Sequence, residues 1–339
     1  MIKFYVNLFI FLFFFSSKAQ ISDFKNINFK KADSIAKVYQ GENLKNLSKL
    51  TYNLTNSLET DVEKFRAIHT WICLNIKINH SAFIKNQNKR NKFRNNPLEL
   101  EKWNKNFVLE IINTLIQKKK TVCTGYSYLL KKMANNAGIK CEIIDGFGRT
   151  ASIIQDKNFD PNHSWNAVKL NEKWYLCDPT WSSGYMDLDL NRFVFKYIDS
   201  YFLATPKIFA KSHYPLLKKW LLFEEGFTLE KFKNAPIIYD EAFENDVFPI
   251  FPTTFEIVAK KQEEFVFLLK QEKGKYKPKI SLELISGSYS IIKNPTINFN
   301  ENGEIEVKFT FKNKGKYDVH IRANGKIICT YLVKVKRKK

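Results

Sequence analysis

The sequence predicts an α+β protein, in which helices packed on an antiparallel sheet are followed by a small all-β region. Three observations predict this class. Apolar residues recur at three- and four-residue spacing up to residue 138, and they alternate at a spacing of two over 139–178. From about residue 245, short alternating runs are separated by glycine or asparagine turns. The chain has 339 residues, more than one domain usually holds, so two domains are expected.

The start of the chain predicts export. Lys3 precedes an apolar run over 4–15, and Ser17-Lys18-Ala19 has the small-x-small pattern of a signal-peptide cleavage site. The run is shorter than the roughly 20 residues that cross a bilayer as a helix, which favours a cleaved signal over a membrane anchor. The mature chain is therefore expected in the periplasm or outside the cell, without a membrane span.

Changes in composition and in the spacing of apolar residues divide the chain into segments. We expect a signal peptide over 1–19, a helical segment over 20–60, a mixed α and β domain over 61–244, and an immunoglobulin-like β-sandwich over 245–339. The capping box Thr60-Asp61-Val62-Glu63 predicts a helix over 61–76. Residues 79–106 are rich in Asn, Lys and Arg, and we expect a long exposed loop, or an insertion around a helical fragment near Leu98, then a helix over 107–118.

The composition is strongly basic. Lys and Arg number 55 against 34 acidic residues, and the formal net charge is +21. The sequence has no helix-turn-helix, zinc-finger or aromatic-basic RNA motif, which argues against specific nucleic-acid binding. A basic surface on an exported protein favours contact with anionic envelope or matrix polymers.

The five cysteines, at 73, 123, 141, 177 and 329, do not have metal-ligand spacing. Cys73, Cys141 and Cys177 have apolar neighbours and are expected to be buried, although a bridge between Cys141 and Cys177 is an alternative in an oxidising compartment. We predict no cofactor and no metal. The acidic stretch 187–189 is expected to be solvated surface, since a calcium site needs about six oxygen ligands or more.

Cys123 differs from the other cysteines in its context. It lies just inside the start of a helix whose Tyr126, Leu130 and Met133 repeat at helical spacing, and Gly138 follows the helix end. A helix N-terminus stabilises a thiolate, and its backbone N–H groups can bind the oxyanion of an attacked acyl group.

A histidine and a carboxylate are predicted to meet on neighbouring strands. Residues 163–170 and 173–178 are strand candidates joined by Asn171-Glu172 as a two-residue turn. Pairing Leu170 with Lys173 makes His163 a diagonal neighbour of Asp178 on one face, within side-chain reach. A slip of one residue would place the two groups on opposite faces. A carboxylate on one imidazole nitrogen leaves the other nitrogen to accept a thiol proton.

Three blocks together resemble the transglutaminase-like superfamily. Val122-Cys123-Thr124-Gly125-Tyr126 resembles its nucleophile block, His163-Ser164-Trp165-Asn166-Ala167-Val168 its histidine strand, and Trp174-Tyr175-Leu176-Cys177-Asp178-Pro179-Thr180-Trp181 its aspartate strand. Residues 64–72, Tyr201-Phe202-Leu203, Pro206, His213-Tyr214-Pro215 and Trp220 are similar to the kyphoscoliosis-peptidase branch. The resemblance covers roughly residues 45–236.

The resemblance implies a papain-like core, with Cys123 as nucleophile, His163 as general base and then acid, and Asp178 as the orienting group. It implies acyl transfer through a Cys123 thioester. We expect a cysteine peptidase or amidase that acts on a protein or peptide. A crosslinking transglutaminase, or a non-catalytic binding or scaffold protein on the same fold, is the alternative. Family members often use a further oxyanion donor upstream of the cysteine, for which Gln117 and Trp103 are candidates.

Overall fold

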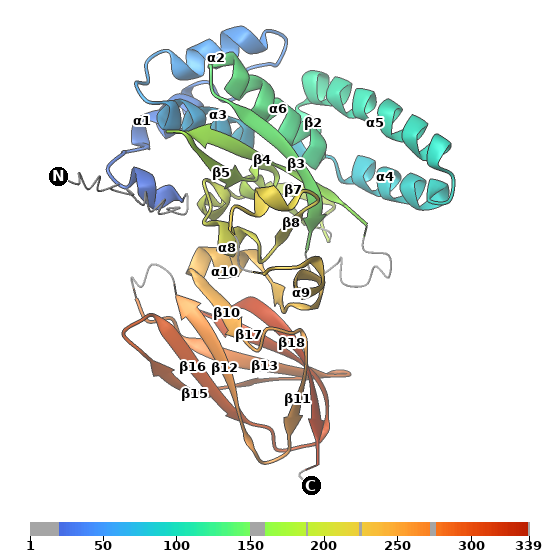
Figure 1. Cartoon of the computed structure of the whole chain (residues 1–339), viewed down its shortest axis with the longest axis vertical. Helices are drawn as coiled ribbons and strands as arrows, with labels where there is room; N and C mark the ends of the chain where they lie inside the picture. The colour runs from blue at the N-terminus through green and yellow to red at the C-terminus, as the bar shows by residue number, and fades with distance from the viewer. Residues whose placement is uncertain (1–19, 150–159, 188, 224–225, 272–275, 338–339) are drawn as a thin grey trace, which may run out of the picture.

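The structure is a computed structural model, which describes residues 20–149, 160–187, 189–223, 226–271 and 276–337. The predicted signal peptide over 1–19 lies outside the described residues. Figure 1 shows two parts: helices cover a small sheet in the N-terminal part, and strands make up the C-terminal part, at whose far end the chain finishes. Among the residues that the structure describes, no helix is both long and apolar enough to cross a membrane.

The helices lie mostly in the first part of the chain. They are α1 (Lys30–Val38), α2 (Leu47–Thr55), α3 (Asp61–Asn75), α4 (His80–Phe93), α5 (Pro97–Lys118), α6 (Cys123–Asn136), α7 (Pro179–Ser183), α8 (Pro206–Phe209), α9 (Leu229–Asn234) and α10 (Asp240–Asn245), with the 3-10 turns η1 (Ile21–Phe24), η3 (Asp199–Tyr201) and η4 (Lys218–Leu221).

The strands form several sheets. Those before residue 240 are β1 (Lys77–Ile78), β2 (Lys120–Thr121), β3 (Cys141–Gly148), β4 (His163–Leu170), β5 (Lys173–Cys177), β6 (Gly184–Asp187), β7 (Arg192–Phe195), β8 (His213–Pro215) and β9 (Ile237–Ile238). Those after it are β10 (Val247–Phe251), β11 (Glu256–Lys260), β12 (Glu264–Gln271), β13 (Ile280–Ser286), β14 (Tyr289–Lys293), β15 (Thr296–Phe299), β16 (Glu304–Thr310), β17 (Gly315–Ala323) and β18 (Lys326–Lys336).

The central sheet has the order β5-β4-β3-β8, and its neighbouring strands are antiparallel. The β4–β5 hairpin is closed by Asn171 and Glu172, both in the left-handed region with φ of 47° and 62°. Two such residues make the turn whose twist matches that of paired strands. Leu170 therefore pairs with Lys173, and the predicted register is confirmed.

Helices α3 and α6 form the layer that packs on this sheet. The predicted capping box starts α3, where the Thr60 side chain accepts from the backbone of Glu63 and the Glu63 side chain accepts from the backbone of Thr60. Helix α6 buries Tyr126, Leu130 and Met133 completely. Burial of each such large side chain contributes roughly 1.5–3 kcal/mol, so this contact holds the start of α6 firmly above β4.

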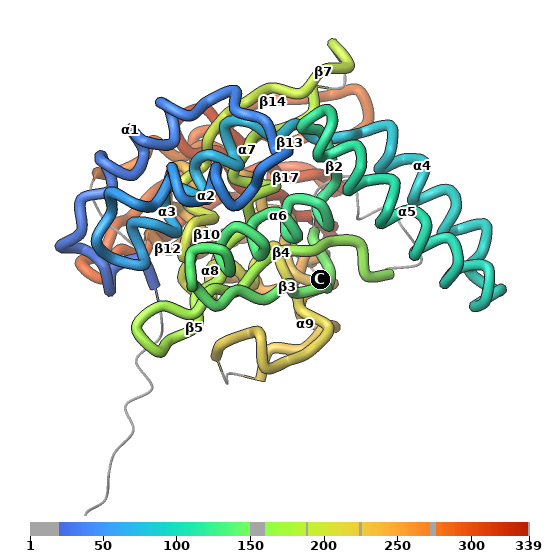
Figure 2. The backbone as a smooth tube through the Cα atoms, turned by 90° about the horizontal axis from the view of Figure 1, so that it is seen from above, coloured from blue at the N-terminus to red at the C-terminus, as the bar shows by residue number. Residues whose placement is uncertain are grey.

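The prediction of an exposed loop over 79–106 is wrong. Those residues form α4 and the first half of α5, an antiparallel pair that projects beside the sheet in both Figure 1 and Figure 2. Asn79 and Asn96 cap the two helices, accepting backbone N–H groups with their side chains. The pair buries only a small cluster, which includes Phe107, Ile111 and Val122. Polar residues on the remaining faces hide the helical period.

The C-terminal part consists of two sheets, one with the order β10-β12-β16-β15 and one with β11-β18-β17-β13-β14. Pairing is antiparallel except between β11 and β18. Their inner faces pack together, with the Phe267 and Tyr331 rings 5.2 Å apart. The α+β class and the all-β C-terminal region are confirmed.

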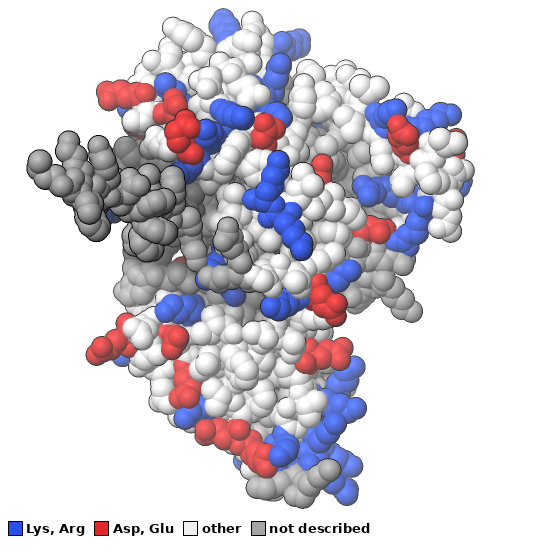
Figure 3. Space-filling view, in the orientation of Figure 1, with Lys and Arg blue, Asp and Glu red and all other residues white. Residues whose placement is uncertain are grey.

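The two parts share one buried cluster. It includes Trp165 of the central sheet, Phe243 of α10, and Val333 of β18. In addition, β9 lies before the expected division at residues 244 and 245 but pairs with β18. The division itself stays a prediction. Figure 3 shows basic side chains spread over both parts and interspersed with acidic ones.

Candidate functional site

Cys123 is the first residue of α6, directly after Val122, whose backbone is extended. The first N–H groups of a helix have no partner within it, so a thiolate here lies at the positive end of the helix. The Cys123 thiol is partly exposed, whereas the other four cysteines are buried free thiols. The alternative bridge between Cys141 and Cys177 is therefore absent.

His163 and Asp178 meet as the strand register predicts. His163 is the first residue of β4, and its Nε2 donates to Oδ2 of Asp178 at 2.7 Å. Asp178 follows β5 and caps α7, so its Oδ1 accepts the backbone N–H groups of Thr180 at 2.7 Å and Trp181 at 3.2 Å. The Trp181 ring stacks on His163 with centroids 4.9 Å apart. The imidazole is thus held in both position and plane.

The charged forms of Cys123, His163 and Asp178 stabilise one another. Burial alone lowers the pKa of His163, but the Asp178 charge and hydrogen bond, together with Cys123, raise it to about 10. Burial likewise raises the pKa of Asp178, yet His163 and His213 hold it well below its usual range. Burial raises the pKa of Cys123, and hydrogen bonds from His163 and the Ser164 backbone lower it below its ordinary value. The arrangement favours a thiolate beside an imidazolium, as acyl transfer to sulfur requires.

A second histidine reaches the same carboxylate. The Nε2 atom of His213 lies 3.0 Å from Oδ2 of Asp178, and both side chains are completely buried. Sequence reasoning did not place His213 in the site. The signal was its own place in the block His213-Tyr214-Pro215, which is similar to the kyphoscoliosis-peptidase branch, but nothing in the local sequence shows that β8 pairs with β3.

These three side chains are also the group among the described residues that could hold a metal ion, with candidate ligand atoms within 4.8 Å of one another. However, Oδ2 of Asp178 already accepts a hydrogen bond from each imidazole Nε2. An ion would have to displace both protons. The donor set therefore fits a hydrogen-bond network better than a metal centre.

The two candidate oxyanion donors are placed in the helical pair. The Trp103 indole N–H donates to Asn86 at 2.9 Å, so it is already used within that pair. Gln117 is an exposed residue near the end of α5. The backbone N–H of Cys123 at the start of α6 is the donor that the fold places beside the thiol.

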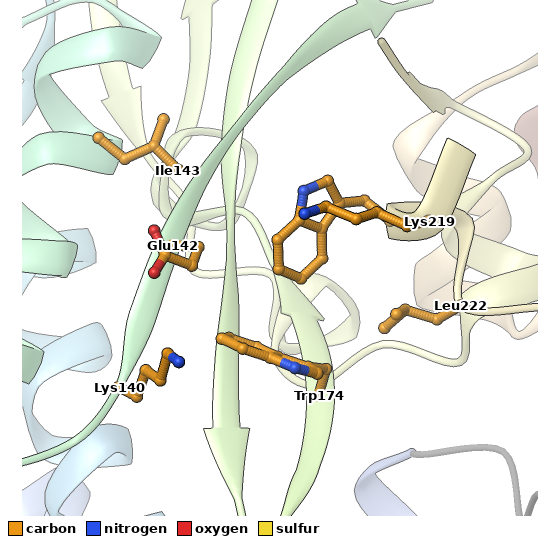
Figure 4. A pocket seen from close by; sticks show the side chains of 7 residues that line it. Lys140, Glu142, Ile143, Trp174, Lys219 and Leu222 are labelled. Carbon is orange, nitrogen blue, oxygen red and sulfur yellow. The ribbon is translucent and has the colours of Figure 1, made fainter. Parts of the chain in front are cut away.

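A separate pocket of about 540 Å³ lies at the other end of the same strands. Figure 4 shows Lys140 and Glu142 on one side of the pocket and Lys219 and Leu222 on the other, with Trp174 of β5 between them. The Trp174 and Trp220 rings are perpendicular at 5.1 Å. Because Trp174 starts β5 while Asp178 follows its end, this pocket does not include the thiol site.

A helix-borne thiol facing a histidine and a carboxylate on an antiparallel sheet defines a papain-like cysteine centre. Residues 48–179 match the family model of the transglutaminase-like superfamily. The resemblance seen in the sequence is therefore confirmed for these residues, which form a transglutaminase-like domain.

The similar proteins show which branch of the superfamily this chain resembles. The chain is 30% identical to kyphoscoliosis peptidase of Homo sapiens and 29% identical to that of Mus musculus, each over 210 residues, which is 61% of this chain. It spans about 29% of the length of either relative. A solved structure described as a TGase shares 17% identity over 47% of this chain and 36% of its own, with a TM-score of 0.28, too low to carry an argument. The likeness to the kyphoscoliosis-peptidase branch is thus confirmed.

Proposed function

We propose that the protein is an exported cysteine peptidase or amidase, which cleaves amide bonds of polypeptides through a thioester at Cys123. The observation that carries this proposal is the buried pair of His163 and Asp178 beside a partly exposed thiol. Export is supported by the pattern of residues 1–19. The relatives are peptidases by name, kyphoscoliosis peptidase, which favours hydrolysis.

In the first half of the reaction, the Cys123 thiolate attacks the carbonyl carbon of an amide. Negative charge passes to the carbonyl oxygen, which the N–H groups at the start of α6 stabilise. The C–N bond then breaks, and the leaving amine takes the proton of the His163 imidazolium. A thioester at Cys123 and a neutral His163 remain.

In the second half, His163 acts as a base. It takes a proton from water, whose oxygen attacks the thioester, and the C–S bond breaks to release a carboxylic acid. Asp178 stays ionised throughout and stabilises the imidazolium each time it forms. If a primary amine takes the place of water, the same thioester gives a crosslink.

The experiment uses the mature chain, an unfolded polypeptide substrate and a fluorescent primary amine. Hydrolysis should give new carboxyl termini detected by mass spectrometry, and these products should vanish in Cys123→Ser. Cys329→Ser is the matched control, because that thiol is buried in the C-terminal sheets. Incorporation of the amine without new termini would replace the peptidase with a crosslinking enzyme. If neither product forms and the Cys123 thiol is inert, the protein is a binding scaffold.

The basic surface supports a second contact, with anionic envelope or matrix polymers. Without residues 1–19, which contain Lys3 and Lys18, the formal net charge is +19, which should attract such polymers, and the attraction should weaken as salt rises. Sedimentation of the mature chain with an anionic polysaccharide over a salt series tests this. Binding that does not depend on salt would contradict the electrostatic reading.

A further inference from the structure

The Asp178 carboxylate is held by more than the groups that a thiol triad needs. Its Oδ1 accepts two backbone N–H groups, from Thr180 and Trp181. Its Oδ2 accepts from His163 at 2.7 Å and lies 3.0 Å from Nε2 of His213. An ionised carboxylate can only accept hydrogen bonds, so Nε2 of His213 must carry a proton.

The other nitrogen of His213 is also assigned by its partner. Nδ1 lies 2.9 Å from the Ser212 hydroxyl, which can donate to it. A neutral imidazole that donates from Nε2 accepts at Nδ1, so both hydrogen bonds fit one tautomer. The Ser212 hydroxyl also lies 3.4 Å from the Phe209 carbonyl oxygen, a second acceptor for its one proton, so it is compatible with the form of His213 that serves Asp178 without being the only group that sets it.

The surroundings of His213 keep the ring neutral and fixed. The Phe209 ring stacks on it at 4.0 Å with planes 20° apart, and the Trp181 ring lies at 4.3 Å. The titratable groups that face it are Asp178, His163 and Tyr201. Burial, the largest influence, lowers the pKa of His213 to about 4.

We propose that His213 is a positioning residue of the thiol site, which fixes the Asp178 carboxylate through a second imidazole N–H so that His163 stays aligned with Cys123. This inference rests on the proposed function. Rotation of the carboxylate moves both oxygens, so the backbone donors on Oδ1 oppose it. The N–H of His213 adds a second donor on Oδ2, which further restricts the position of the oxygen that accepts from His163.

The test measures alkylation of Cys123 by iodoacetamide against pH in the mature chain. His213→Phe keeps a ring among Phe209 and Trp181 but loses the N–H, whereas His213→Gln keeps an N–H donor. We expect His213→Phe to slow alkylation at neutral pH by about tenfold or more, the usual effect of losing a hydrogen bond to a charged group. In this variant, the pH below which alkylation of Cys123 slows should also be higher than in the parent. His213→Gln should stay within about threefold of the parent, because its amide restores the donor.

Ser212→Ala is a milder variant, which leaves the ring in place and removes only the partner of Nδ1. It should slow alkylation by about threefold or less, since only the choice of tautomer is affected. Labelled histidine spectra should show His213 of the parent as the neutral tautomer protonated at Nε2.

The outcomes separate the two proposals. An inert parent thiol overturns the proposed function, and the positioning role with it. A reactive parent with an equally reactive His213→Phe, or equal losses in the Phe and Gln variants, overturns the positioning role alone. A His213→Phe protein of lower thermal stability but unchanged alkylation per folded molecule shows a purely structural residue and also overturns it.

Discussion

Replacing Asp178 with asparagine should move the proton of neutral His163 from Nε2 to Nδ1. The amide oxygen of Asn would keep the place of Oδ1, because the backbone N–H groups of Thr180 and Trp181 need an acceptor there. The amide NH₂ would then point at Nε2 of His163 and of His213. His163 would have to accept at Nε2 and carry its proton on Nδ1, facing Cys123, where it cannot take the thiol proton.

The size of the effect follows from the pKa of His163, which the site raises from 6.5 to about 10. At about 1.36 kcal/mol per pKa unit this difference corresponds to roughly 5 kcal/mol. Asp178 is the largest favourable influence on it, and we take roughly 2–3 kcal/mol for the carboxylate, in the upper part of the range for losing a hydrogen bond to a charged group. Asp178→Asn should therefore lower the neutral-pH population of the thiolate and imidazolium pair by roughly 30- to 150-fold.

The assay is the ultraviolet absorbance of the thiolate during a pH titration, with Cys123→Ser as the blank. Glu142→Gln is a matched control, since Glu142 is a carboxylate of the same sheet that pairs with Lys131 instead of a histidine. A folded Asp178→Asn protein whose thiolate still forms at the parent pH would refute the reasoning, because the carboxylate would then not set the proton position.

Two further predictions concern stability. A methyl group at Gly125 would lie 1.9 Å from the Thr121 hydroxyl, so Gly125→Ala should lower the free energy of unfolding by roughly 1–3 kcal/mol in urea titrations. Adding Thr121→Ala should restore only part of it, because the Cβ of residue 121 would still lie 2.8 Å away, and no recovery would argue against this contact. Burial lowers the pKa of His213 to about 4 and that of His69 to about 3, while it raises the pKa of Asp240 to about 6. Below about pH 6.5 both histidines take up protons in the unfolded chain while they stay neutral in the folded one, so the free energy of unfolding falls. Asp240 takes up its proton at a higher pH in the folded chain than in the unfolded one, which offsets part of the loss. Unfolding free energy should drop by roughly 3 kcal/mol between about pH 7 and 4.5, and a flat profile would contradict the neutral burial of the histidines.

The contact between His163 and Asp178 was predictable because it depends on local features. Two alternating runs flank Asn171-Glu172, so the turn alone sets which residues face each other. That pairing places the two side chains on one face, and the hydrogen bond at 2.7 Å follows.

His213 was not predictable in the same way. It pairs with Gly148, which lies far back along the chain, and no turn sets that register. Helix α4 and the continuity of α5 from Leu98 to the predicted helix over 107–118 were not predicted, for another reason. Few residues of this helical pair are buried, so hydrophobic periodicity, the main signal for a helix, is weak there even though Asn79 and Asn96 cap it well.

The buried cluster shared by the two parts has a mechanical consequence. Trp165 belongs to it, and the Trp165 ring lies 6.0 Å from the ring of His163 and 5.0 Å from that of His213. Close-packed side chains transmit displacement instead of absorbing it. Phe243 of α10 and Val333 of β18 belong to the same cluster, so the side chain that packs against both imidazoles is itself packed among residues of the C-terminal part.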